Sequence, residues 1–309
     1  MTAPVGTDGE RGAAGERRHL TAVAYRLLGS LTEAEDVVQE TYARWYALTA
    51  RQRGDIEVPA AWLTTVAGRI CLDLLRSARV RRERYVGAWL PEPLPGGERG
   101  DGPPEDAGDP AERVALDESV HMAFLVLLEE VTPAERVAFV LHDVFRYSFV
   151  EIAGVVGRTP AACRQLASSA RRRVRGAQPG AAAAGAGSAT EQASLVREFQ
   201  QAWQAKDIAA LVGLLDPGAV MVTDGGGLAQ AAARPVEGGE PIARYLAHFA
   251  ARAPGLDLSV RTVNGRPGLV ARHAGTTVSV AAFAFTGDGG TARISRIWTV
   301  RNPDKLRAW

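Results

Sequence analysis

The chain of 309 residues has only two cysteines, Cys71 and Cys163, which are far apart and lack the spacing of zinc ligands. Both fall in segments expected to be helical, where a small buried thiol is the usual role. No apolar run approaches the ~20 residues of a membrane span, and the segment 1–18 lacks the apolar core of a secretion signal. We therefore predict a cytoplasmic protein with no membrane partner, no metal and no cofactor.

The sequence also lacks an excess of one charge, because its formal net charge is +1. Taken alone, this value argues against nucleic acid as a partner. The charges are unevenly distributed, however. Residues 69–84 contain six arginines against two acids, and residues 164–175 contain five arginines and no acid, whereas residues 92–118 contain nine acids against two arginines. Two concentrated basic segments separated by an acidic one keep nucleic-acid binding open.

Apolar residues recur at helical spacing in two regions, which are separated by a segment rich in Gly, Pro and acidic residues. That segment cannot bury enough apolar surface to fold alone and predicts a linker. A second, Ala- and Gly-rich joint follows the second helical region. The predicted organisation is a flexible tail (1–15), a helical domain (16–86), an acidic linker (87–113), a second helical domain (114–176), a linker (177–189) and a third domain (190–309).

The pattern changes in the third domain. Amphipathic helices come first, and a further helix is predicted over 241–252. The β-rich runs, separated by Gly turns, cover 219–223, 256–263, 268–272, 276–285 and 292–300. This order favours an α+β domain with a curved antiparallel sheet, so that the whole chain has two all-α domains and one α+β domain.

The clearest local signal is a helix-turn-helix at 145–175. A short helix is predicted from Phe149 to Val156, and Gly157 supplies the turn because it tolerates a left-handed backbone. Thr159 is a good N-cap, and Pro160 is a good first residue for the second helix. This second helix is the one expected to enter the major groove of DNA.

The second helix has an apolar stripe, predicted at Ala162, Leu166, Ala170 and Val174, and a basic face opposite. Arginine can recognise guanine, glutamine can recognise adenine, and the remaining cations can hold phosphates. The DNA contacts are expected from Arg164, Gln165, Ser168, Ser169, Arg171 and Arg172. The alternative is a solvated basic face of an ordinary helical bundle.

The basic cluster after Leu75 (Arg76, Arg79, Arg81, Arg82 and Arg84) is a weaker signal, since a run of charge is usually only solvated. The nearby aromatics Trp62 and Tyr85 are what stacking on unpaired bases requires. An acidic helix face between Glu33 and Glu40 is either a docking surface or simply exposed to solvent.

Three segments resemble the extracytoplasmic-function sigma factors. Residues 24–46 and 61–83 resemble sigma region 2, and residues 125–174 resemble sigma region 4. The resemblance implies that Asp36, Gln39 and Glu40 bind the polymerase clamp. It implies that a helix carrying Asp73, Arg76, Arg79, Arg81 and Arg82 reads and melts the −10 element, and that region 4 reads the −35 element. The implied partners are core RNA polymerase, through its clamp and flap elements, and promoter DNA.

The rest of the chain is similar to the sigma-J-like subgroup, which carries a SnoaL-like domain of the nuclear transport factor 2-like superfamily. The similarity depends on WLPEP (89–93), DGGG (224–227) and NPDKL (302–306), although Leu228 stands where the family usually has a basic residue. It implies a regulatory contact between domains through Trp89, Leu90, Pro91, Asp224, Gly225, Gly226, Gly227, Asn302, Pro303, Asp304, Lys305 and Leu306.

Two other functional classes remain open. One is a helix-turn-helix regulator that acts without polymerase. The other is an isomerase or cyclase in which Asp224, His248 and His273 supply an acid/base pair. We favour the regulatory role, with no catalytic residue, and leave open whether the third domain binds a small molecule. The acidic stretch 92–118 is expected to run through the basic interior of the polymerase.

Overall fold

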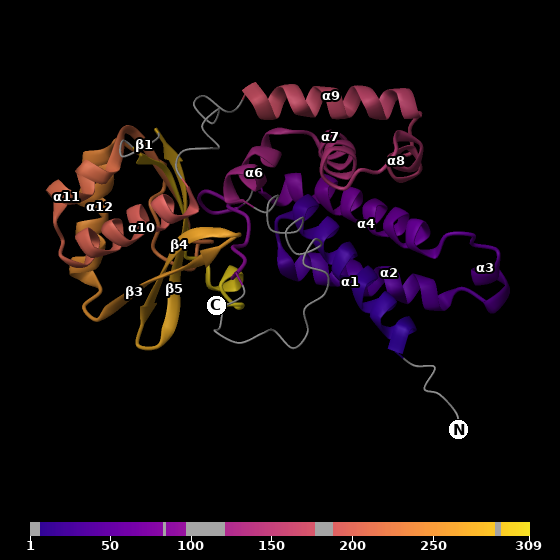
Figure 1. Cartoon of the computed structure of the whole chain (residues 1–309), viewed down its shortest axis with the longest axis horizontal. Coiled ribbons are helices and arrows are strands. Elements are labelled where there is room, and N and C mark those ends of the chain that lie inside the picture. The colour runs from indigo at the N-terminus through magenta and orange to yellow at the C-terminus, as the bar shows by residue number, and fades with distance from the viewer. Residues whose placement is uncertain (1–6, 83–84, 97–120, 177–187, 288–291) are drawn as a thin grey trace. The chain divides into compact units, whose positions relative to one another are not determined.

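The structure is a computed structural model that describes residues 7–82, 85–96, 121–176, 188–287 and 292–309, with side chains except at 7–14 and 78–82 (Figure 1). It divides into two compact units. The N-terminal unit contains the described residues of 7–82 and 127–176, and the C-terminal unit contains those of 85–96, 121–126 and 188–309. None of the described helices has the length and apolar character needed to cross a membrane.

Four helices form the first part of the N-terminal unit: α1 (Thr7–Leu28), α2 (Leu31–Ala47), the short α3 (Ala50–Gly54) and α4 (Pro59–Arg82). Helix α1 begins within the segment predicted as a tail. Gly29, at φ 70°, ends it in the left-handed conformation. Ser30 is therefore the first extended residue and caps α2 by accepting a hydrogen bond from the Glu33 amide at 3.3 Å.

The second part of this unit contains the predicted helix-turn-helix. It comprises α6 (Met122–Leu127, whose first five residues belong to the C-terminal unit), the 3-10 turn η1 (Leu128–Glu130), α7 (Pro133–Phe139), the π turn η2 (Val140–Val144), α8 (Phe149–Val156) and α9 (Pro160–Gly176). Gly157 has φ 70° and ends α8, and the Ala162 amide donates to Thr159 Oγ1 at 3.2 Å. The predicted turn, cap and helix limits are confirmed.

The C-terminal unit packs three helices on one six-stranded sheet. The helices are α10 (Ala189–Gln204), α11 (Ile208–Leu214) and α12 (Gly239–Arg252). The strands are β1 (Leu215–Asp224), β2 (Val236–Glu237), β3 (Leu256–Val263), β4 (Arg266–His273), β5 (Thr276–Thr286) and β6 (Arg293–Val300), in the order β2-β1-β6-β5-β4-β3. The sheet is mixed rather than antiparallel, since β1 pairs with β6 in parallel. Both strands are central and distant in sequence, which is why local patterns did not reveal their pairing.

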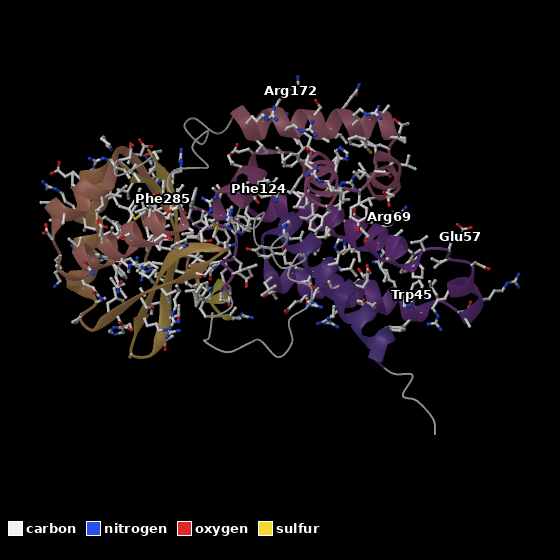
Figure 2. All side chains as sticks on the ribbon, in the orientation of Figure 1. Trp45, Glu57, Arg69, Phe124, Arg172 and Phe285 are labelled. Atoms are coloured by element: carbon white, nitrogen blue, oxygen red, sulfur yellow. The ribbon has the colours of Figure 1, made fainter. Side chains whose placement is uncertain are left out.

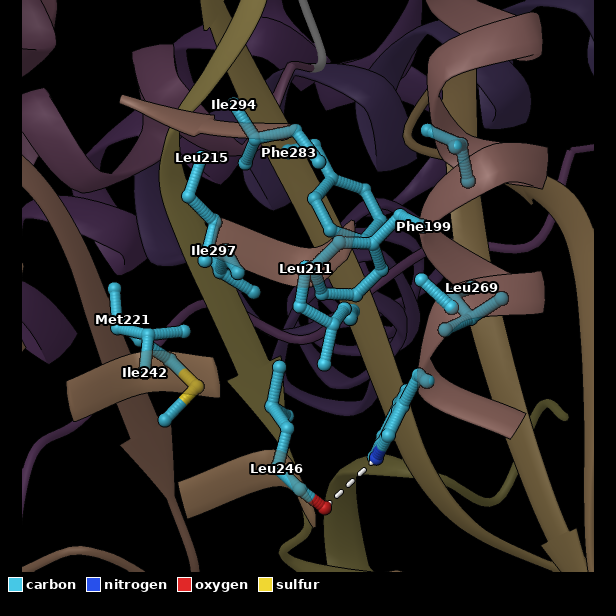
Figure 3. Close-up of a cluster of buried hydrophobic side chains, with 14 of the residues drawn as sticks. Phe199, Leu211, Leu215, Met221, Ile242, Leu246, Leu269, Phe283, Ile294 and Ile297 are labelled. Atoms are coloured by element: carbon cyan, nitrogen blue, oxygen red, sulfur yellow. Dashed lines mark hydrogen bonds between the residues drawn. The ribbon is translucent and has the colours of Figure 1, made fainter. Parts of the chain in front are cut away.

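Both faces of the sheet are buried, which explains why β5 is apolar at nearly every position. One face, with Phe283 and Ile297, packs against the helices around Phe199 and Leu211 (Figure 3). The other face, with Val270, Val280 and Trp298, packs against Leu90, Met122 and Leu306. Residues 87–96, predicted as part of the linker 87–113, thus contribute to the second core of this unit.

Candidate functional site

Helix α9 presents a basic face to solvent. Its buried residues are Cys163, Ala167, Ala170 and Val174. The predicted apolar stripe is therefore correct at the C-terminal end of the helix. At the N-terminal end it is displaced by one residue, because Ala162 and Leu166 are only half-buried. Of the predicted DNA contacts, Arg164, Gln165, Ser168 and Arg172 are exposed. Arg172 extends away from α7 and α8 in Figure 2. The Arg164 guanidinium also lies over the Phe149 ring, with its Cζ 5.3 Å from the centroid. All four side chains remain accessible from solvent.

Two other predicted DNA contacts are engaged inside the unit. The Arg171 guanidinium donates to both carboxylate oxygens of Asp143, at 2.7 and 2.9 Å. Ser169 hydrogen-bonds the Glu135 carboxylate. Burial raises the pKa of Glu135, but the hydrogen bonds from Ser169 and Thr132 outweigh burial and hold that pKa below its usual value. Arg171 and Ser169 therefore attach α9 to the helices beneath it.

The predicted polymerase contacts Asp36, Gln39 and Glu40 are all exposed on α2. Glu40 pairs only with Arg44 of the same helix, at 2.8 Å and with both side chains about half exposed. Such a pair contributes little to stability, so it does not compete strongly with a partner. The three side chains form a polar surface that is accessible for docking.

Helix α4 carries the second basic cluster. Asp73 and Arg76 are exposed and paired at 3.2 Å. The side chains of Arg79, Arg81 and Arg82 lie outside the described residues. Trp62 is half-buried against Trp45, with ring centroids 5.3 Å apart. Tyr85, which was expected to stack on bases, instead donates a hydrogen bond to Asp224 at 2.6 Å.

The two helical regions of the N-terminal unit pack against each other, a contact that sequence reasoning missed. Arg69 of α4 donates to the Gly154 carbonyl of α8 at 2.8 Å (Figure 2). The Tyr147 hydroxyl is 3.0 Å from Thr64 Oγ1 and 2.7 Å from His19 Nε2. These polar contacts accompany the apolar packing of α8 against α4.

A buried arginine completes this contact between regions. Arg136 of α7 is 3% exposed and donates to the Leu27 carbonyl at 3.0 Å and to Glu129 at 2.9 Å. Burial lowers its pKa to about 10. An arginine is costly to bury unless its N–H groups are paired. Nη1 of Arg136 has both of these acceptors, whereas its Nε has no hydrogen-bond partner among the described residues, so the bond to the Leu27 carbonyl is what links the two regions.

The C-terminal unit contains a buried polar cluster, here called the Asp224 clasp, formed by Tyr85, Leu90, Asp224, Asn302 and Lys305. The Asp224 carboxylate is fully buried. One oxygen accepts from the Tyr85 hydroxyl and the other from the Leu90 amide at 2.9 Å and from Lys305 Nζ at 2.7 Å. Asn302 Nδ2 donates to the Tyr85 hydroxyl at 2.9 Å. The three motifs that resemblance singled out thus meet through one carboxylate.

The neighbouring residues of these motifs fix the geometry of the clasp. Gly226 has φ 61°, its amide donates to Asp224 at 3.0 Å, and a Cβ there would stand 2.4 Å from Asn302 Nδ2. Lys305 Nζ lies 4.2 Å from the centroid of the Trp89 ring, and it also donates to the Leu90 carbonyl. Asp304 is exposed and pairs with Arg307. Trp309, which the sequence did not single out, donates to the Pro93 carbonyl at 2.9 Å.

The structure does not assemble the acid/base group considered from sequence. Asp224 faces the segment 85–90, whereas His248 and His273 line a cleft on the helix-covered face of the sheet. Within the described residues, no group of three or more His, Cys, Asp or Glu is arranged to hold a metal ion. Cys71 and Cys163 are buried free thiols, as predicted.

Family models match all three folded parts of the chain. The model of sigma-70 region 2 matches residues 14–81, that of sigma-70 region 4 matches residues 121–174, and that of the SnoaL-like domain matches residues 196–309. The fold and exposed basic helix described above therefore define a sigma-70-type protein that carries an additional SnoaL-like domain.

Full-length relatives make the assignment more specific. The chain is 39% identical over 296 residues to the ECF RNA polymerase sigma factor SigJ of Mycobacterium tuberculosis. This match covers 94% of this chain and 90% of the relative. It is 34% identical to the probable ECF RNA polymerase sigma factor SigI of the same species, over 94% and 93%. The crystal structure of SigJ matches with a TM-score of 0.71 at 35% identity, covering 96% of this chain and 98% of that chain. The protein belongs to the ECF RNA polymerase sigma factors.

Proposed function

We propose that the chain binds core RNA polymerase through α2 and directs it to promoters, with α9 reading the −35 element and α4 the −10 element. The observation that carries this proposal is the capped helix-turn-helix whose exposed face offers Arg164, Gln165, Ser168 and Arg172. Asp36, Gln39 and Glu40 provide the docking surface on a separate helix. This division of roles needs no catalytic residue.

Promoter binding requires the two helical regions to separate. The −35 and −10 elements are about 25 base pairs apart, or ~85 Å at 3.4 Å per base pair. A compact unit of roughly 130 residues has a radius of gyration of about 14 Å. The packed N-terminal unit is therefore too small for α4 and α9 to reach both elements, and its internal contact is a closed state that polymerase binding would open.

We also propose that the C-terminal domain regulates access of α4 to the promoter through the Asp224 clasp. Leu90, which Asp224 holds, follows the last residue of α4 by eight positions. Eight extended residues span at most ~28 Å. A closed clasp therefore limits how far α4 can move from the C-terminal domain. An open clasp releases the chain that follows α4, so that α4 can move farther.

The acidic stretch proposed to enter the polymerase lies mostly outside the described residues.

Run-off transcription with core polymerase tests the proposal. The variant R164A/Q165A changes two exposed side chains of α9, and R197A is the control because it removes an exposed arginine from α10, a helix of the C-terminal unit. Output should fall at least tenfold in the first variant, since one base contact is worth about 1–3 kcal/mol, and stay unchanged in the second. Normal output from R164A/Q165A, or failure of the wild-type chain to associate with core polymerase, contradicts the proposal.

A further inference from the structure

A cleft opens on the helix-covered face of the C-terminal sheet. It has a volume of about 470 Å³ and is lined by residues that include His248, Arg252 and His273. This volume lies in the range of small-molecule sites. Tyr245, Phe249 and Arg301 line both the cleft and a narrower space of about 20 Å³ that leads inward between Trp203, Met221 and Leu269. The inner space holds about one water molecule.

The lining of the cleft is cationic. It contains two arginines and two histidines, and none of the described residues that line it is an aspartate or glutamate. Arg301 donates to the Gln230 carbonyl and lies over the Phe249 ring, with its Cζ 4.4 Å from the centroid. Arg252 approaches only His248, at 3.5 Å. Within the described part of the chain, neither arginine has a carboxylate partner.

Among the described residues, two polar atoms of the inner space are buried without a hydrogen-bond partner. They are Thr223 Oγ1, on β1, and Arg301 Nε, on the residue that follows the neighbouring strand β6. Thr223 is only 3% exposed. A buried donor without an acceptor is unfavourable, and such groups in native proteins usually have a functional or ligand-binding reason. Burial also lowers the pKa of Arg301, and an anion would relieve this penalty.

We propose that this cleft binds a small organic acid whose carboxylate meets Arg301 and places one oxygen against Thr223 in the inner space, and whose apolar or aromatic body lies against Phe249 and Tyr245 in the cleft. Arg301 supplies the charge-assisted hydrogen bond, Thr223 supplies a neutral one, and the rings supply apolar contact. Arg252 at the mouth adds positive potential that favours an anion over a neutral molecule.

The site is directly connected to the Asp224 clasp. Successive residues of a strand point to opposite faces of the sheet. Thr223 and Arg301 line the inner space on one face, while their chain neighbours Asp224 and Asn302 belong to the clasp on the other face. The amide of Arg301 donates to the Asp224 carbonyl at 2.7 Å. An acid bound in the cleft therefore acts on the backbone that positions the clasp. An effect of the acid on transcription rests on the proposed function, whereas the binding of the acid does not.

Calorimetric titration of the full-length chain tests the site without polymerase. The probes are benzoate, phenylacetate and indole-3-acetate, each paired with its neutral amide. At least one acid should bind, and its amide should bind roughly tenfold or more weakly, a difference of about 1.4 kcal/mol. Equal binding of acid and amide, or no binding of any acid at millimolar concentration, overturns the proposal.

Two variants locate the binding. T223V keeps the shape of the side chain and removes a hydroxyl that has no partner, so it should weaken acid binding without lowering the melting temperature. R301Q should weaken acid binding at least tenfold, and R296Q, which changes an exposed arginine of the preceding strand β6, should not. Wild-type affinity in both T223V and R301Q overturns the assignment. Because these titrations contain no polymerase, their failure is distinct from a failure in run-off transcription.

Discussion

Lys305 Nζ lies 2.7 Å from Asp224 Oδ2 in a place where the carboxylate is fully buried and the lysine side chain is 11% exposed. The pair joins the end of β1 to the turn η4 (Pro303–Lys305). The same carboxylate oxygen accepts the Leu90 amide. One charge therefore holds the C-terminal turn and the segment after α4 together.

Replacing Asp224 with asparagine should destabilise this unit and release the segment 85–90. D224N keeps the size of the side chain but removes the carboxylate charge that Lys305 Nζ faces at 2.7 Å, and breaking a buried ion pair typically costs about 3–5 kcal/mol. Chemical unfolding should show this loss, and the Leu90 amide should lose protection from hydrogen exchange. The control is D304N, which alters an exposed ion pair with Arg307 and should change stability by less than about 1 kcal/mol. Wild-type protection of Leu90 in D224N would refute the clasp.

A glycine in α4 offers a direct test of the closed state. A Cβ at Gly68 would stand 2.7 Å from Cγ1 of Val155, and valine is stiff, so G68A should push α8 away from α4. A Cβ at Gly154 would meet nothing within 4 Å. Both changes favour helix by up to about 1 kcal/mol. If the packed state restrains the protein, G68A should increase association with core polymerase severalfold, and G154A should not.

The size of the free protein provides the readout for this pair of variants. Small-angle scattering should show a larger radius of gyration for G68A than for wild type or G154A. An unchanged radius together with unchanged polymerase association would mean that the contact between α4 and α8 does not restrain opening.

Local features were predictable from sequence because local chemistry determines them. Gly157, Thr159 and Pro160 define the turn of the helix-turn-helix through backbone preferences that need no tertiary information. The hairpins between β3, β4 and β5 turn at Asn264–Gly265 and Ala274–Gly275, all with positive φ, in agreement with the predicted Gly turns. The strands of this meander matched their predicted segments for the same reason.

Long-range pairing could not be predicted in this way. Tyr85 meets Asp224 across 139 residues, and Arg136 meets Leu27 across 109. Nothing in the sequence near Tyr85 distinguishes a base-stacking aromatic from one held by a distant carboxylate. The resemblance named the motifs of the clasp, but only the fold showed that one carboxylate joins them. The pairing of Arg171 was missed for the same reason, because its partner Asp143 lies 28 residues earlier, on η2.

Two neighbouring arginines of α9 should have different roles. Arg172 is exposed, so R172A should lower run-off output and reduce the salt dependence of promoter binding by about one unit of slope, as expected for one lost phosphate contact. Arg171 is paired with Asp143, so R171A should lower the free energy of unfolding by roughly 0.5–1 kcal/mol. A stability loss in R172A that matches that of R171A would show that the exposed side chain is structural too.

The Tyr85 hydroxyl should make stability depend on pH in the alkaline range. Burial, together with its hydrogen bond to the Asp224 carboxylate, raises the pKa of this phenol in the folded state well above its usual value. The folded state therefore keeps the proton after an unfolded chain would lose it, and stability declines as pH rises above about 10. The contribution is fully present at neutral pH. Tyr42 and Tyr147, whose pKa values burial also raises, add to this decline.

The variant Y85F separates the contribution of Tyr85 from the others. It should lower the free energy of unfolding by about 1 kcal/mol at neutral pH, because two hydrogen bonds are lost. Above a pH of about 10 its stability should fall less steeply than that of wild type, since no phenol remains to ionise at this position. Y46F, which removes a hydroxyl from a side chain that is 67% exposed, should follow the wild-type curve. Parallel pH curves for Y85F and wild type would show that the Tyr85 proton is not coupled to folding, and the clasp would then depend on Lys305 and Leu90 alone.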